Sequence, residues 1–153
     1  MVKTSKKKHK YAELESLLRH YKNFKTGIKN LQQQLDFIMP GITTSYDIQE
    51  GSRGTFVIDS KTERFAIDRI ESKRALDLRE KISIYELIVS CIDAALDDLN
   101  DNERQFVELR YFKGKTIEDL AEIMGYAPRS VFNLRNEVLE RLSISLSGVL
   151  RLW

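Results

Sequence analysis

Apolar residues recur at steps of three and four between residues 11 and 39, a spacing that predicts one long amphipathic helix. This stripe consists of Leu14, Leu17, Tyr21, Phe24, Ile28, Leu31, Leu35 and Ile38. Heptad spacing of this kind is typical of a helix that packs lengthwise against another helix. The partner is either a second helix of this chain or the same helix in another subunit. Pro40 and Gly41 end the predicted helix, because proline disfavours a helical residue before it.

A second apolar stripe predicts another long helix over residues 60–99. Ser60 and Glu63 have the spacing of a capping box at its start. We expect the two long helices to be antiparallel or coiled-coil-like. Residues 40–59 between them are rich in Gly, Ser and Thr, which indicates a flexible loop or linker. Residues 55–58 have strand-like composition, so a small hairpin around residues 51–54 is one option for this loop.

The remaining segment, residues 100–153, predicts a helix followed by two more helices around a tight turn. Asn100 and Glu103 have capping spacing, and Thr116 is a good N-cap for the helix that follows. Gly125 suits the left-handed residue that ends a helix, and Pro128 suits the first turn of the next one. Helical spacing then continues in Val131, Leu134, Val138 and Leu142. The pattern is that of a helix-turn-helix, and the fold class is all-α.

The last predicted helix has a polar face opposite its apolar face. Arg and Asn side chains can form paired hydrogen bonds with guanine and adenine in a major groove. The candidate base-reading residues are Arg129, Ser130, Phe132, Asn133 and Asn136. The residues just before the first helix of the helix-turn-helix are candidate phosphate contacts. They are Lys113, Lys115 and Thr116. The alternative is an ordinary solvated face on a helical hairpin.

Charge is distributed unevenly along the chain. The formal net charge is only +2, so the protein is not a uniformly basic nucleic-acid coat. Residues 1–10 nevertheless carry five lysines and predict a basic disordered tail, which leaves the rest of the chain slightly acidic. Lys6, Lys7 and Lys8 in this tail are either phosphate contacts or a solvated end.

Residues 99–142 resemble region four of bacterial sigma factors. The similarity includes Glu103-Arg104, Leu109-Arg110-Tyr111, Thr116-Ile117-Glu118, the spacing from Ala121 to Gly125, and Leu139 with Leu142. Taken whole, the chain resembles the sigma-like late transcription regulators of phages and prophages, of the RinA and ArpU type. It departs from the region-four pattern at the start of the last helix, where Ala127 replaces the usual Ser or Thr cap. Phe132 also stands where a basic residue is common.

The resemblance implies a transcriptional regulator that binds double-stranded DNA and activates late genes, in a bacterial host's cytoplasm and in contact with RNA polymerase. Two alternatives remain open. One is a DNA-packaging subunit similar to a phage small terminase, and the other is a coiled-coil adaptor that does not bind DNA. In each case the N-terminal helices offer a surface for homo-oligomerisation.

The residue inventory does not favour an enzyme. His9 and His20 are the two histidines, and no catalytic or metal-ligand spacing includes them, so we expect no cofactor and no metal site. Cys91 is the one cysteine and falls in the second apolar stripe, where a small core residue fits. No apolar run approaches the roughly 18 residues of a membrane span.

Overall fold

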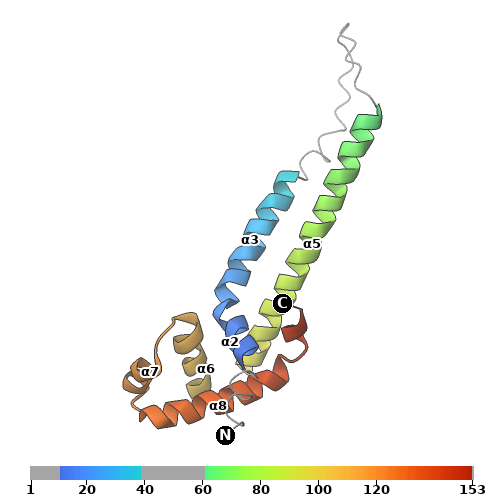
Figure 1. The fold of residues 1–153 in the computed structure, drawn as a ribbon. Helices are drawn as coiled ribbons and strands as arrows, with labels where there is room; N and C mark the ends of the chain where they lie inside the picture. The colour runs from blue at the N-terminus through green and yellow to red at the C-terminus, as the bar shows by residue number, and fades with distance from the viewer. Residues whose placement is uncertain (1–10, 39–60, 153) are drawn as a thin grey trace. The chain divides into compact units, whose positions relative to one another are not determined.

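The computed structural model describes residues 11–38 and 61–152, and every element that these residues form is a helix. The predicted all-α class is therefore confirmed. The elements are α2 (Ala12–Arg19), α3 (Tyr21–Ile38), α5 (Lys61–Asp97), α6 (Asp101–Val107), the π-helical turn η1 (Glu108–Phe112), α7 (Ile117–Met124), α8 (Pro128–Ser145) and the 3-10 turn η2 (Val149–Arg151) (Figure 1).

Several predictions lie outside the described residues. These are the basic tail with Lys6, Lys7 and Lys8, the loop over residues 40–59 with its hairpin option, and the capping serine Ser60. The described residues form two compact units. Residues 11–26 and 85–152 make up the first unit, and residues 27–38 and 61–84 make up the second.

The second unit is a pair of helical segments that pack side by side, the C-terminal part of α3 and the N-terminal part of α5 (Figure 1). Leu35, Ala75 and Ile82 are buried at their contact, and the flanking apolar residues are Ile28, Leu31 and Leu78. This part of the first apolar stripe therefore packs on another helix of the same chain, as one of the two interpretations expected. Self-association through these helices stays a prediction.

The N-terminal end of the first stripe belongs to the first unit, where it is more deeply buried. Leu14, Leu17 and Leu18 of α2 are fully buried, and α2 contacts η1, α8 and η2. Leu18 was not part of the heptad stripe, so α2 buries a broader face than a coiled-coil seam requires. The single helix expected over residues 11–39 is also divided at His20, whose backbone (φ −87°, ψ 2°) separates α2 from α3.

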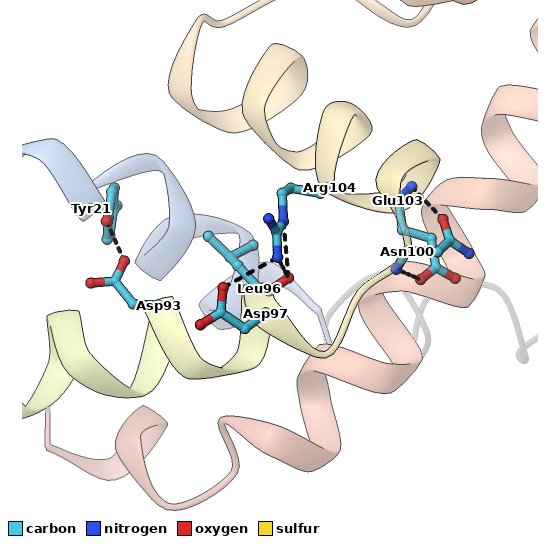
Figure 2. A network of polar contacts seen from close by, with 7 residues as sticks. All are labelled: Tyr21, Asp93, Leu96, Asp97, Asn100, Glu103 and Arg104. Atoms are coloured by element: carbon cyan, nitrogen blue, oxygen red, sulfur yellow. Dashed lines mark hydrogen bonds and ion pairs between the residues drawn. The ribbon is translucent and has the colours of Figure 1, made fainter.

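Aromatic side chains pack the start of α3 against its neighbours in the first unit. The ring of Tyr21 stacks on that of Phe112 with 4.6 Å between centroids. The Tyr21 hydroxyl donates a short hydrogen bond to Asp93 of α5 (Figure 2). Burial and the nearby Asp93 carboxylate raise the pKa of Tyr21. Phe24 meets Tyr85 edge to face at 5.2 Å. These contacts hold α3, α5 and η1 together near the division between α2 and α3.

The junction between α5 and α6 is closed by polar contacts that the sequence partly predicted (Figure 2). The predicted capping box is present, because Asn100 accepts the Glu103 N–H at 2.9 Å and Glu103 accepts the Asn100 N–H at 3.1 Å. Arg104 donates to the Leu96 carbonyl at 3.3 and 3.1 Å and to Asp97 at 3.2 Å. These bonds satisfy backbone groups that a helix end leaves without a partner.

Leu18→Ala tests whether α2 is an integral part of the first unit. Removal of a fully buried leucine side chain should lower the free energy of unfolding by about 2–5 kcal/mol, measured by urea denaturation followed by circular dichroism. The control is Leu76→Ala in α5, because Leu76 is 63% exposed and its loss should cost about 0.5 kcal/mol or less. Equal effects of the two substitutions would contradict the observed packing.

Candidate nucleic-acid interface

The helix-turn-helix is built from local signals that the sequence predicted. Thr116 caps α7, because its hydroxyl accepts the Asp119 N–H at 3.2 Å and Asp119 in turn accepts the Thr116 N–H at 3.1 Å. The second bond lowers the pKa of the Asp119 carboxyl. Gly125 ends α7 in the left-handed conformation, with φ 69°. Pro128 then begins α8, and Ala127 before it makes no side-chain capping bond.

The crossing of α7 and α8 is set by buried apolar residues. Leu120 and Val131 are fully buried, and Ala121 is 8% exposed. A small residue at the crossing lets the two backbones approach closely. Val138, Leu139 and Leu142 continue the buried side of α8, so this helix has one fixed face toward the core.

The opposite side of α8 presents the predicted base-reading residues to solvent. All five are exposed, namely Arg129, Ser130, Phe132, Asn133 and Asn136. They lie within the first nine residues of the helix, directly after the turn. A recognition helix reads base edges with residues near its N-terminus. The structure therefore brings these side chains together on one surface, and their contact with bases stays a prediction.

The predicted phosphate contacts lie just before α7. Lys113, Lys115 and Thr116 are all exposed. Gly114 between the two lysines has φ 70°, a conformation that favours glycine and that turns the chain from η1 into α7. Arg110 supports the same turn, because it donates to the Lys115 carbonyl at 2.7 Å. The π-helical turn η1 that precedes this turn was not predicted from the sequence.

One anchor of α8 was missed by the sequence analysis. Arg135 donates to the Glu15 carboxylate of α2 at 3.0 Å from Nε and 2.5 Å from Nη2. The Tyr111 hydroxyl donates to the same carboxylate at 2.9 Å. Burial, followed by the charge of Glu15 and this bond, raises the pKa of Tyr111 above its usual value of 10.0. The Glu15 carboxylate thus joins α2, η1 and α8.

A second charged anchor fixes α8 to α6. The Glu103 side chain is 3% exposed and lies 2.9 Å from the Arg141 guanidinium. Its carboxylate also closes the capping box at Asn100. A buried carboxylate requires such partners, because burial of an unpaired charge is costly. Together Glu15 and Glu103 tie α8 at two points 6 residues apart, at Arg135 and Arg141.

The Lys and Arg residues of the segment 90–142 differ in whether they are paired with a carboxylate. Residues 90–142 contain 7 Lys or Arg and 11 Asp or Glu. Arg104, Arg135 and Arg141 are held in ion pairs. Lys113, Lys115 and Arg129 are exposed and form no ion pair with any residue that the structure describes. Two of these cations precede α7 and the third lies in the first turn of α8.

The comparison with known protein families agrees with this geometry. Residues 90–142 match the family model described as Sigma-70, region 4. The match covers about a third of the 153 residues and contains the end of α5, α6, η1, α7 and most of α8. This part of the chain is therefore similar to sigma-70 region 4, a family of DNA-binding helix-turn-helix domains. No curated protein and no solved structure matches the chain.

The described residues contain neither a metal-binding cluster nor a membrane-spanning helix. Within residues 11–38 and 61–152, no cluster of three His, Cys, Asp or Glu could hold a metal ion. Across the same part of the chain, no helix is long and apolar enough to span a membrane. Cys91, interpreted as a core residue, is half-buried.

Glu15→Gln tests the anchor between α2 and α8. The substitution keeps the shape of the side chain but removes the charge that binds Arg135 and Tyr111. We expect a loss of about 1.5–3 kcal/mol in the free energy of unfolding, the range for hydrogen bonds to charged groups. The measurement is urea denaturation. Glu13→Gln is the matched control, because Glu13 lies on the same helix and is exposed. A parent-like Glu15→Gln variant would show that the charge of Glu15 contributes nothing to stability.

Proposed function

We propose that this protein is a sequence-specific DNA-binding regulator of transcription, which inserts the N-terminal part of α8 into the major groove. The observation that carries the proposal is the two-sided character of α8. Its apolar side is fixed in the core, and the side chains on its other side are exposed and able to bond with base edges. The region 4 match supports the proposal, because that family is a DNA-binding class.

Within this proposal the exposed residues have distinct roles. Arg129 and Asn133 are 4 residues apart, one helical turn, and both are exposed. They suit hydrogen bonds with guanine and adenine respectively. Lys113 and Lys115 suit phosphate contacts, which fix the register of the helix on the duplex but carry no sequence information. The Thr116 hydroxyl already accepts the Asp119 N–H, so its contribution to DNA would come from the hydroxyl proton.

The finer part of the proposal is activation of late genes of a phage or prophage, with contact to host RNA polymerase. It is supported by the resemblance of the whole chain to the sigma-like late regulators and by the region 4 match. Mapping of bound sites across the host genome would test it. Occupancy of a promoter upstream of packaging, morphogenesis or lysis genes is the expected result. Sites scattered without relation to promoters would contradict activation.

Arg129→Ala separates base reading from general attraction to DNA. Loss of the guanidinium should weaken binding to the preferred duplex by about 1–3 kcal/mol and should weaken binding to a scrambled duplex much less. Lys115→Ala should instead weaken both complexes together, because a phosphate contact does not depend on sequence. Titrations of both duplexes measure these differences, and thermal melts confirm that the variants fold.

Arg151→Ala is the matched control for Arg129→Ala. It removes an exposed arginine that lies in η2, outside the helix-turn-helix, and it should bind both duplexes like the parent. The assignment of α8 as a recognition helix is wrong if Arg129→Ala and Asn133→Ala also leave both affinities unchanged.

Deletion of residues 1–10 tests whether the tail lysines contact phosphates. If they do, the deletion should weaken binding to every duplex alike and should reduce the dependence of affinity on salt. Each lost phosphate contact changes the slope of log affinity against log salt by about 0.9. Preference for the correct sequence should survive. The measurement is a series of titrations at several salt concentrations, and an unchanged slope would show that the tail is only a solvated end.

A further inference from the structure

Phe132 is an apolar side chain on a surface of otherwise polar candidates. It is 51% exposed and lies in the first turns of α8, beside Arg129, Asn133 and Asn136. Single exposed apolar residues are common on proteins, so exposure alone assigns no role. Its position is more informative, because a phenyl ring here would enter the groove together with the polar side chains around it.

The ring also has a neighbour that limits its movement. The Arg135 guanidinium carbon lies 5.8 Å from the centroid of the Phe132 ring. Arg135 is itself held by Glu15, and its side chain is 19% exposed. Glu15 therefore has two effects on the exposed surface at the start of α8. It engages the Arg135 cation so that this arginine does not compete for bases, and it keeps the guanidinium beside the ring.

Among the four bases, thymine alone offers an apolar group in the major groove, its C5 methyl. A phenyl ring forms no hydrogen bond with a base edge, but it can contact this methyl and remove it from water. We infer that Phe132 is a specificity-determining residue that reads the C5 methyl group of a thymine in the target sequence. The inference rests on the proposed function, because it needs α8 in the major groove.

Uracil in place of thymine removes this methyl and keeps every hydrogen-bonding group. The preferred duplex is first selected from random sequences, and each of its thymines is then replaced in turn by uracil. At one or two positions the parent protein should bind the uracil duplex about fourfold more weakly, the factor for one buried methyl group. Phe132→Ala should bind the thymine and uracil duplexes equally at those positions, because the contact has already been lost.

Two further variants make the comparison specific to the ring. Phe132→Leu keeps an apolar contact and should retain the thymine preference. Ile144→Ala removes another exposed apolar side chain of α8, 12 residues further along the helix, and should behave like the parent. If Phe132→Ala fails to fold, a parent protein that is insensitive to every uracil replacement still overturns the inference.

The outcomes separate this inference from the proposed function. If no preferred duplex emerges from the selection, both are overturned. A preferred duplex without any sensitivity to uracil overturns only the methyl contact. The methyl contact is also overturned if Phe132→Ala keeps the preference for thymine. The same holds if Phe132→Ala weakens binding to duplexes with thymine and with uracil equally at every position while the parent shows no preference, because that result would indicate a ring inserted between bases. Unchanged DNA binding by Phe132→Ala would overturn the inference as well.

Discussion

The Glu15 carboxylate joins three segments that are far apart in the sequence. Its partners Tyr111 and Arg135 lie 96 and 120 residues further along the chain. A carboxylate removed from water in this way needs partners, and both donors are directed at it. Because Arg135 belongs to α8, the placement of this helix depends on a residue of α2. The N-terminal helix is thus a structural part of the helix-turn-helix unit.

Because α8 depends on α2, the structural unit that contains the helix-turn-helix is longer than the segment that the family model covers. The match begins at residue 90, whereas Leu14, Leu17 and Leu18 of α2 are fully buried in contact with the same helices. A segment that began at residue 90 would lose these three side chains and the Glu15 charge together. Arg135 would then lose its Glu15 partner beside the exposed residues of α8. The α2 helix therefore both buries apolar surface of this unit and holds the Arg135 cation in an ion pair.

Local signals were sufficient to predict the helix-turn-helix. Thr116, Gly125 and Pro128 act through the backbone within a few residues, and the structure has each in its predicted role. Periodicity was less informative for α2, because a heptad stripe identifies an apolar face but not its partner. Nothing in the spacing distinguished Leu18 from a surface residue or Glu15 from a solvated one. The π-helical turn η1 likewise depends on tertiary packing, in which Leu109 and Tyr111 are both buried.

The excess of acidic residues in the region 4 segment bears on how it would bind DNA. Phosphate neutralisation supplies most of the non-specific affinity of a DNA-binding protein. Here three of the seven cations are engaged by carboxylates, and the exposed, unpaired ones gather at Lys113, Lys115 and Arg129. Under the proposed function, a domain of this kind would gain little affinity for duplexes in general, and contacts with base edges would make up a larger share of its affinity. Under the proposed function, the five lysines of residues 1–10 are the part of the chain whose charge would add to the general attraction to DNA.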